Sequence, residues 1–500
     1  AKSLSPLILA LSRRRNNIPV TETFTHIISS ALSVGLGGSA GLEAPSVLTG
    51  AAFGANTASY FRIDQRHRSL LLGCGAAAAI SAIFGSPVAG VLFVAEVLLP
   101  EFTGSSLVPM VMSSAVSAVV SRMLMGDHQF FLAINAPWRT DAVPCYVLVG
   151  IFCGLVGVYI VKGAYRLSKE LKGRFRNPWH RFAAGGSVLA ILLFCFPALR
   201  GQGYGYIDRL FHSDLEGLAQ QGFFSGADAL PVWAMLILLV LIILLKLIAS
   251  VLTVDCGGDG GIFAPSMFMG AVAGFVFARA VNLTGLIELQ EFNFVAVGMC
   301  GVFSAVMRAP LTGIFLIAEV TGSYILLVPL MIVSAVSCLT ARLFEANSIY
   351  RKVLVESNLL STDRDLSMLR RMSVRLNIIR KYHPLPANAP LESVIAVVER
   401  TRDEFFPVLD ENGKLQGVVY LTRILAAMLN KEIYDHLLVF DLMEMPDCVL
   451  SPDDDLSVAM KGFEECNVGL LPVCDKEGVF LGFVGKVPIF NQYRRLVKEA

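Results

Sequence analysis

The chain has 500 residues, of which 55% are hydrophobic and 16% are charged, and its formal net charge is +1. An ordinary soluble domain contains about 25% charged residues, so this composition excludes a typical soluble protein, and the near-zero net charge gives no sign of nucleic-acid binding. The longer apolar runs reach the roughly 17–25 residues that span a bilayer. Runs broken by glycine and proline predict discontinuous or re-entrant helices. We therefore expect an all-α, multi-pass integral membrane domain, with apolar runs at 107–120, 145–161, 232–252, 294–306 and 325–339.

One carboxylate, Glu43, lies among glycines and alanines in the stretch Gly-Gly-Ser-Ala-Gly-Leu-Glu-Ala-Pro-Ser at 37–46, immediately before long apolar sequence. An acid inside a bilayer costs about 2.5–3.5 kcal/mol on insertion scales, which makes it a candidate functional residue. Pro45 suits the first turn of a helix, and such a helix directs free N–H groups and its positive dipole end toward whatever precedes it. One alternative is an acid that only satisfies its own helix dipole. A dinucleotide-binding loop is disfavoured, because the glycine spacing is wrong and no strand precedes it.

The same stretch recurs later in the chain. Residues 257–271 match 37–51 at eight of fifteen positions, and 309–320 match 86–97. Two matching blocks at nearly one offset indicate an internal duplication, and duplicated membrane halves often have inverted topology with a binding site at their interface. The counterpart of 145–205 would lie before the first residue, so we expect the N-terminal part of the first repeat to be missing from this chain.

The second copy of the glycine-rich stretch keeps the predicted helix start and loses the acid. Gly-Gly-Ile-Phe-Ala-Pro at 260–265 places Ile262 and Phe263 where the first copy has Leu42 and Glu43. Two helix N-termini that converge on one point form an anion site without a fixed cation. The Glu43 carboxylate could occupy this site as a built-in anion, and protonation or displacement would vacate it.

Other polar residues favour structural interpretations. Glu96 and Glu319 hold equivalent positions in the repeated blocks, which favours packing or hydrogen bonding over chemistry. The basic clusters at 62–68 and 162–181 are expected to be loops, the second in the cytoplasm by the positive-inside rule. The ten cysteines have no metal-binding spacing and lie mostly in apolar runs, which is typical of small core residues.

The C-terminal part has the composition of a soluble α/β protein, and it contains a second repeat. Residues 406–413 match 471–478, each followed by a glycine and an apolar pair. Each unit predicts a helix, a strand, a glycine turn, a second strand and a helix. The expected divisions are a membrane domain at 1–361, a linker at 362–376 and two α/β domains at 377–431 and 438–497.

These residues are similar to the CLC family of chloride channels and chloride/proton antiporters, and the C-terminal pair resembles CBS domains. Gly-Leu-Glu-Ala-Pro at 41–45 resembles the family's Gly-Arg/Lys-Glu-Gly-Pro motif, and 260–265 resembles its Gly-x-Phe-x-Pro motif. Residues 73–102 and 308–324 resemble its other signature stretches. The resemblance covers nearly all of 1–360. It implies an inverted repeat with re-entrant helices, a homodimer with one anion pathway in each subunit, and cytoplasmic CBS domains, here in a prokaryotic cell membrane.

The resemblance also implies roles for single residues. It makes Glu43 the gating glutamate, which competes with chloride for the outer and central sites. It makes the backbone N–H groups of Ile262 and Phe263 chloride ligands, and Tyr350 matches the pore tyrosine. The serine of the family's Gly-Ser-Gly-Ile-Pro motif has no match, and the repeat argument places it upstream of Ala1. The full implied anion-binding set is Gly41, Leu42, Gly261, Ile262, Phe263, Ala264 and Tyr350.

Departures from the family's pattern bear on function. Leu42 stands where the family usually has Arg or Lys, and Ala44 replaces the motif's second glycine. Val97 stands where the antiporters commonly have a second glutamate that passes protons from the cytoplasm, and an alkyl group cannot carry a proton. In the CBS pair, Thr422 lacks the following Asp that grips the ribose in many nucleotide-binding pairs, which disfavours an adenine nucleotide.

We therefore expect a voltage-gated-type chloride channel that conducts chloride and other small anions passively and is gated by Glu43, not an enzyme, with no cofactor, metal or nucleic acid. The alternative is a chloride/proton antiporter that uses Glu43 with a non-standard internal proton route. Two others are an organic-solute transporter with a similar inverted repeat, and a channel-derived sensor that depends on its CBS pair. The first needs side-chain donors in a wider pocket, whereas both motif loops offer mainly backbone and apolar groups.

Overall fold

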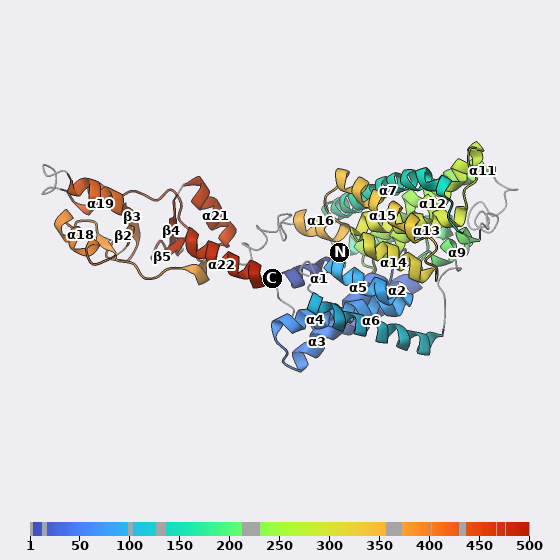
Figure 1. Ribbon diagram of the computed structural model, residues 1–500, viewed down its shortest axis with the longest axis horizontal. Helices are drawn as coiled ribbons and strands as arrows, with labels where there is room; N and C mark the ends of the chain where they lie inside the picture. The colour runs from blue at the N-terminus through green and yellow to red at the C-terminus, as the bar shows by residue number, and fades with distance from the viewer. Residues whose placement is uncertain are drawn as a thin grey trace. The chain divides into compact units, whose positions relative to one another are not determined.

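The computed structural model describes most of the chain as two compact units, at residues 1–360 and 361–500 (Figure 1). Most of the predicted linker, 362–376, lies outside the described residues. The described residues are 4–12, 18–98, 104–126, 137–212, 231–356, 373–401, 403–429, 437–466, 468–475 and 477–499.

The first unit is helical, which confirms the predicted fold class. Within its described residues, seven helices are long and apolar enough to cross a membrane, and shorter apolar helices lie between them. Its first half contains α1 (Ser5–Ser12), α2 (Glu22–Gly35), α3 (Glu43–Tyr60), α4 (Gln65–Phe84), α5 (Pro87–Phe93), a π-helical turn (Val94–Leu98) and α6 (Gly104–Met125). Its second half contains α7 (Val143–Arg174), α8 (Pro178–Cys195), α9 (Tyr204–Phe211), α11 (Val232–Asp255), α12 (Phe263–Thr284), α13 (Glu291–Met307), α14 (Pro310–Val320), α15 (Leu327–Phe344) and α16 (Ile349–Glu356).

The sequence duplication is also a duplication of structure. Helix α3 packs on α4 as α12 packs on α13. A Cβ on Gly50 would lie 2.3 Å from the Gly75 carbonyl oxygen, and a Cβ on Gly270 would lie 2.4 Å from the Gly298 carbonyl oxygen. Small residues at such contacts let two membrane helices approach backbone to backbone. The two helix pairs are thus built by one repeated pattern of glycines.

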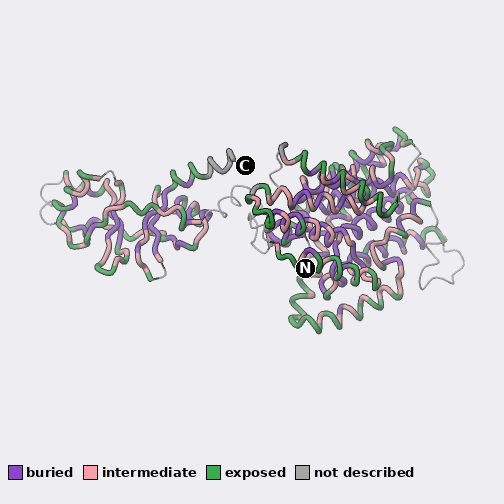
Figure 2. Tube along the Cα trace, turned by 90° about the horizontal axis from the view of Figure 1, so that it is seen from below, coloured by how far each residue is buried: buried purple, intermediate pink, exposed green. Residues whose placement is uncertain are grey.

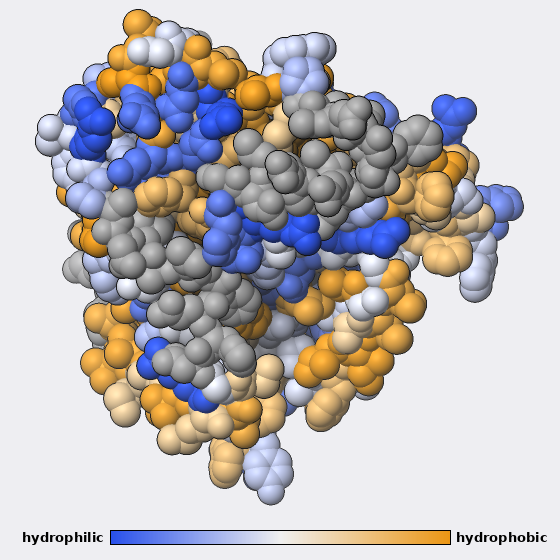
Figure 3. Space-filling model, turned by 90° about the vertical axis from the view of Figure 1, so that its right-hand side faces the viewer, coloured by the Kyte–Doolittle hydropathy of each residue, from blue (hydrophilic) through white to orange (hydrophobic). Residues whose placement is uncertain are grey.

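The helices of this unit differ in how much of their surface is buried. Figure 2 shows buried residues in the interior of this unit, and every residue of α13 from Asn293 to Met307 is buried. Helix α6 is the opposite case, since most of its apolar side chains are exposed, with Met110 as a buried exception. Apolar side chains also cover broad areas of the face in Figure 3, as lipid contact requires. The exposed apolar residues of α6 include Leu107, Val108, Val111, Met112, Val116, Val119 and Val120.

The two basic clusters were expected to be loops, and this prediction is largely wrong. Residues 162–174 continue α7, and only a short turn separates them from α8. In the other cluster, helix α4 begins at Gln65, after a turn in which Arg62 has a positive φ of 54°. Lysine and arginine are strong helix formers, so a helix continues beyond its apolar segment wherever its charged residues are solvated.

The second unit contains two copies of the predicted helix–strand–strand–helix order. Each pair of strands is antiparallel, and the register shifts at equivalent points, between Val408 and Leu409 and between Val473 and Cys474. Gly413 and Gly478, with φ of 76° and 84°, make the turns between the strands. The elements are β1 (Leu385–Pro386), α18 (Leu391–Val398), β2 (Phe405–Leu409), β3 (Leu415–Tyr420), α19 (Leu421–Met428), α20 (Val439–Leu442), α21 (Leu456–Glu465), β4 (Leu470–Cys474), β5 (Phe480–Gly485) and α22 (Lys486–Glu499).

Two cysteines depart from the prediction that cysteines are core residues. Cys448 and Cys466 form a disulfide that ties the segment before α21 to the end of that helix. Their sequence separation of 18 gave no signal, because the pairing depends on how the second α/β copy folds. The other eight cysteines are free, and six of them are buried.

The glycine contacts predict that a methyl group at the α12–α13 contact destabilises the membrane unit. A Cβ on Gly274 would lie 1.9 Å from the Phe294 carbonyl oxygen, and overpacking of this kind costs about 1–3 kcal/mol. We expect Gly274→Ala to melt at a lower temperature than the unmodified chain in detergent. Gly186→Ala on α8 is the control, because no atom lies within 4 Å of its added Cβ. Equal melting temperatures for the two variants would contradict the proposed close contact.

Candidate functional site

Two loops, one from each repeat, meet through a pair of backbone hydrogen bonds. The N–H of Gly41 donates to the carbonyl of Gly261, and the N–H of Gly261 donates to the carbonyl of Gly41, both at 2.8 Å. Helix α3 begins two residues after Gly41, and α12 begins two residues after Gly261. The residues that precede the helices have nearly the same backbone, with φ/ψ of −86°/−8° at Leu42 and −91°/5° at Ile262. The two helix N-termini are therefore brought together at one place.

This junction has no room for side chains on its glycines. A Cβ on Gly41 would lie 2.0 Å from Oε2 of Glu43 and 3.1 Å from the backbone nitrogen of Ala264. A Cβ on Gly261 would lie 2.6 Å from the Cβ of Ala44. Glycine is the residue that allows such close backbone approach. The glycines at 41 and 261 thus bring the Glu43 carboxylate next to the start of the other helix.

The Glu43 side chain is fully buried at this junction. The hydroxyl of Tyr204, at the start of α9, donates a hydrogen bond of 2.6 Å to Oε1 of Glu43. Among the described residues, Oε2 has no hydrogen-bond partner. The backbone N–H groups of Glu43 and Ala264 lie near the carboxylate. Free N–H groups and the positive ends of two helix dipoles favour a negative charge here, and the carboxylate supplies it.

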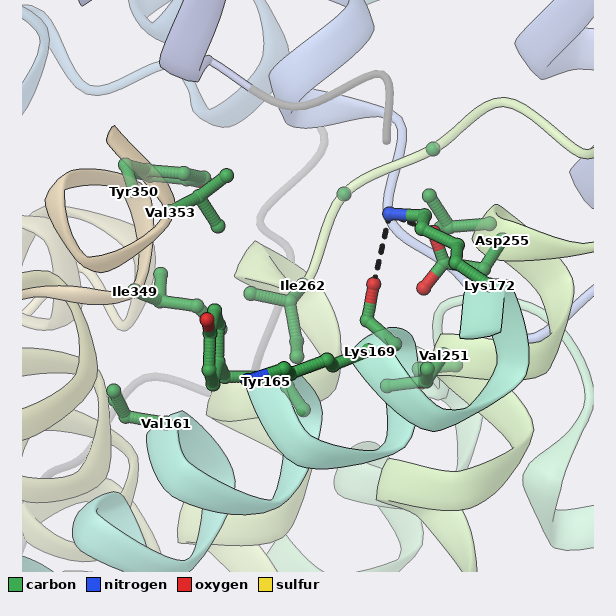
Figure 4. Close-up of a pocket in the computed structure, with 16 residues that line it drawn as sticks. Val161, Tyr165, Lys169, Lys172, Val251, Asp255, Ile262, Ile349, Tyr350 and Val353 are labelled. Carbon is green, nitrogen blue, oxygen red and sulfur yellow. Dashed lines mark hydrogen bonds and ion pairs between the residues drawn. The ribbon is translucent and has the colours of Figure 1, made fainter. Parts of the chain in front are cut away.

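A cavity of about 300 Å³ reaches the second loop from the other direction. Gly260, Gly261 and Ile262 form part of its wall, together with Tyr350 at the start of α16. In Figure 4, Ile349, Tyr350 and Tyr165 lie on one side of this space, and Lys172 and Asp255 lie on the other.

Two lysines of α7 line the same cavity, Lys169 and Lys172. Nζ of Lys172 donates to Oγ of Ser168 at 2.9 Å and lies 3.1 Å from Oδ1 of Asp255 (Figure 4). Lysines on the wall of a cleft attract anions to it. The cavity thus joins a basic wall to the backbone that starts α12.

Tyr350 is buried, and its hydroxyl has no hydrogen-bond partner among the described residues. Its carbonyl accepts a hydrogen bond of 2.9 Å from Oγ of Ser5, so the first turn of α1 packs against α16. A buried hydroxyl without a protein partner is able to donate to a bound ion. Tyr350 therefore has a buried, unused donor beside the second loop.

The structure places the predicted residues in two groups. Gly41, Leu42, Glu43 and the stretch 261–264 lie together at the junction of the loops, and Tyr350 shares the cavity with Gly261 and Ile262. Val97 lies elsewhere, because it is buried in the apolar core on the π-helical turn after α5. Among the residues of 4–356 that the structure describes, no group of three or more His, Cys, Asp or Glu could hold a metal ion.

Sequence reasoning missed Tyr204 and Ser5. Tyr204 lies 161 residues from Glu43 in an irregular Gly-Gln-Gly-Tyr stretch, and no sequence pattern connects the two. Ser5 carried a usable signal, because serine followed by Pro6 is typical of a helix start.

Glu96 and Glu319 cap helices of the opposite repeat. The carboxylate of Glu96 accepts from the N–H groups of Leu311 and Thr312 at 3.0 and 2.8 Å, at the start of α14. The carboxylate of Glu319 accepts from Val88 and Ala89 at 3.1 and 3.0 Å, at the start of α5. These contacts confirm the predicted hydrogen-bonding role, since each acid satisfies N–H groups that a helix start leaves unpaired.

Both units of the chain are similar to known proteins. The family model described as voltage gated chloride channel matches residues 3–342, and the CBS domain model matches residues 374–430. The H(+)/Cl(−) exchange transporter ClcA of Vibrio parahaemolyticus serotype O3:K6 is 29% identical over 334 residues, covering 64% of this chain and 67% of that protein. The putative chloride channel protein ClcB-like of Ralstonia nicotianae is 27% identical over 344 residues, covering 67% and 75%.

Solved structures are similar in fold. A slow cyanobacterial Cl−/H+ antiporter aligns with a TM-score of 0.60 and 22% identity, covering 72% of this chain and 83% of that chain. A CLC-type fluoride/proton antiporter aligns with a TM-score of 0.56 and 24% identity, covering 69% and 82%.

The helix caps predict that removal of a cross-repeat carboxylate weakens the membrane unit. Glu319→Ala leaves the N–H groups of Val88 and Ala89 without their acceptor. A hydrogen bond to a charged group contributes about 1.5–3 kcal/mol, so the melting temperature of the full chain in detergent should fall clearly. Glu288→Ala, in an exposed segment before α13, is the matched control and should melt like the unmodified chain. Similar melting of both variants would mean that the caps contribute little.

Proposed function

The chain belongs to the voltage-gated chloride channel family, and from this premise we propose that it exchanges chloride for protons, with Glu43 as the group on which both ions act. The observation that carries the proposal is the buried Glu43 carboxylate between two helix N-termini, bonded to Tyr204. A carboxylate is an anion that a proton can neutralise, so one side chain is able to link the two ions.

The anion half of the proposal rests on backbone groups. When the Glu43 carboxylate leaves the junction, the helix starts at Glu43 and Phe263 and the hydroxyl of Tyr350 offer donors to chloride. Several such N–H and O–H donors, together with the positive ends of the helix dipoles, can bind an anion without a fixed positive charge. Lys169 and Lys172 raise the local anion concentration in the adjoining cavity. Chloride and the carboxylate therefore compete for the same donors.

The proton half rests on the free oxygen of Glu43. Oε2 has no hydrogen-bond partner among the residues described around it, so a proton added there breaks no existing bond. Protonation removes the negative charge that holds the side chain at the two helix starts. The neutral carboxyl group then gives up its place to chloride, and loss of the proton reverses the exchange.

Proton-coupled exchange replaces the passive channel as the leading proposal because of the comparisons. The curated relatives from Vibrio are named exchange transporters, and two solved structures of the same fold are titled antiporters. The passive channel stays as the second candidate because of Val97, which puts an alkyl group where the common proton route has an acid. We no longer propose an organic-solute transporter that shares only the inverted repeat, because the chain belongs to the voltage-gated chloride channel family.

The remaining assignments are proposals of the same kind. We propose a homodimer, to which the outward-facing apolar side of α6 would contribute, in a prokaryotic cell membrane with the CBS pair in the cytoplasm. The CBS pair would act without an adenine nucleotide, since Thr422 is followed by Arg423 and Ile424 where an acid would grip a ribose.

The main test uses purified protein in liposomes with a chloride gradient, monitored by external pH and a chloride electrode. We expect chloride efflux to drive protons against their own gradient. Glu43→Gln, which keeps the shape and cannot lose a proton, should keep chloride flux and abolish proton movement. Chloride flux without any proton movement in the unmodified chain would favour the passive channel over the exchanger. Unchanged proton movement in Glu43→Gln would place the coupling group elsewhere.

A second prediction concerns the hydrogen bond that holds Glu43. Tyr204→Phe removes the donor to Oε1 while keeping the ring, which packs edge-on against Phe84. A hydrogen bond to a charged group is worth about 1.5–3 kcal/mol, which is at least about tenfold in an equilibrium, so Glu43 should vacate the junction more often and chloride flux should rise by about tenfold or more. Tyr206→Phe on the same helix is the control and should keep normal flux. Normal flux in Tyr204→Phe as well would show that this bond does not limit the gate.

A further inference from the structure

A buried pair, His26 and Asp259, lies behind the second loop of the site. Nδ1 of His26, on α2, is 2.9 Å from Oδ2 of Asp259. The side chain of His26 is 12% exposed, and that of Asp259 is 1% exposed. Oγ of Ser29 donates to the same Oδ2, and the N–H of Asp259 donates to Oγ of Ser33 at 2.9 Å. Asp259 is thus fixed to α2 by three successive turns, of which two hold its carboxylate and the third holds its backbone N–H.

This pair occurs in one repeat and not in the other. The stretch 26–45 has its counterpart in 246–265, so His26 is equivalent to Lys246, and Asp259 is equivalent to Ser39. Ser39 makes the same backbone contact as Asp259, because its N–H donates to Oγ1 of Thr253 at 3.0 Å. The loop attachment is therefore common to both repeats. The carboxylate and the imidazole are additions to the second loop.

The equivalent cation, Lys246, is used differently. It is fully buried, and its Nζ donates to the carbonyls of Leu199 and Gly201, both at 3.0 Å, just before Tyr204. Lys246 makes no ion pair with any acid in the described part of the chain. A proton on Lys246 meets only neutral acceptors, whereas a proton on His26 meets the carboxylate of Asp259. Of these two positions, His26 is the one where protonation neutralises a neighbouring charge.

Asp259 is close to the donors that would hold the anion. It precedes Gly261 by two residues and Ile262 by three, and a chain extends at most about 3.5 Å per residue. The Cα of Asp259 therefore lies within roughly 10 Å of the Cα of Ile262, the residue before α12. With His26 neutral, the pair has a charge of −1, which opposes a bound anion. With His26 protonated, the pair is neutral, and this opposition disappears.

On the basis of the proposed function, we infer that the His26–Asp259 pair is a second proton-binding site of the membrane unit, and that its proton strengthens chloride binding at the start of α12. Linkage makes the effect reciprocal, since bound chloride favours the proton on His26 by the same factor. A unit charge at about 10 Å and an effective dielectric constant of about 20 changes affinity on the order of tenfold. This linkage does not pass through Val97.

Three other titratable groups near the pair have to be distinguished from it in an experiment. Glu22 lies one turn earlier on α2, and Glu43 is the acid of α3, which packs against α2. Asp255 ends α11 and is paired with Lys172. Glu43 would itself link protons to chloride, so the test is made in chains that carry Glu43→Gln.

The experiment is calorimetric titration of the full chain in detergent with chloride, at about pH 5 and about pH 8, on either side of the range where histidine titrates, about pH 6.5. In the Glu43→Gln chain, we expect chloride affinity about tenfold lower at the higher pH. His26→Lys, with the residue of the equivalent position, should bind tightly at both pH values. His26→Gln should bind weakly at both. Asp259→Ser, also the equivalent residue, removes the opposing charge and should bind chloride at about pH 8 as tightly as the Glu43→Gln chain binds it at about pH 5.

The outcomes separate this inference from the function on which it rests. Chloride binding that keeps its full pH dependence in His26→Lys and His26→Gln, with no gain of affinity at about pH 8 in Asp259→Ser, would overturn the role of the pair and leave the exchange proposal standing. No chloride binding at either pH, in the unmodified chain and in Glu43→Gln, would overturn the proposed function itself. If one His26 variant does not elute as a single species, Asp259→Ser still decides, because loss of the carboxylate should raise the chloride affinity at about pH 8, and an unchanged affinity there would overturn the role of the pair.

Discussion

The structure depends on the two backbone hydrogen bonds between Gly41 and Gly261. Helices α3 and α12 begin inside the membrane unit, so the loops before them have irregular backbone where water is scarce. Backbone polar groups in such a place must find partners within the protein, and here each loop satisfies the other. The same contact leaves the first N–H groups of both helices directed at one point. The requirement to pair the backbone thereby creates the site, and the glycines are needed because any side chain would separate the loops.

The rest of the membrane unit repeats this solution, since each repeat supplies what the other lacks. Glu96 of the first repeat caps α14 of the second, and Glu319 of the second caps α5 of the first. Ser33 of α2 accepts from the second loop, and Thr253 of α11 accepts from the first. A helix that begins within a membrane leaves its first N–H groups unpaired. Here each repeat provides the acceptors for the unpaired N–H groups of the other repeat. Neither half is complete alone, so folding of the unit and assembly of the site are the same event.

The fold class and the junction of the two loops could be predicted, because each depends on patterns of neighbouring residues. The apolar runs, the two offsets and the helix starts at Glu43 and Phe263 are local patterns, and they indicate the fold class and the junction. Tyr204 was not predictable, since its contact with Glu43 joins segments 161 residues apart through an irregular turn. His26 was missed because a lone histidine on a helix is usually a core residue. The basic end of α7 was misjudged because charge was taken as a sign of a loop, although lysine and arginine favour helix.

The two repeats also separate structure from function, because what both share is required by the fold. The glycines, the prolines, the capping acids and the loop attachments occur twice. The differences are concentrated at the junction. Glu43 of the first copy is equivalent to Phe263 of the second, and Asp259 of the second copy is equivalent to the uncharged Ser39 of the first. On the helices that hold the loops, His26 of the first copy is equivalent to Lys246 of the second, and the two make different contacts. A symmetric pair of helix starts would only bind an anion. In the proposed function, the carboxylate in the junction makes anion binding depend on a proton, and we infer the same of the carboxylate–imidazole pair that joins α2 to the second loop. The asymmetry between the copies is then the feature that would distinguish an exchanger from a simple anion site.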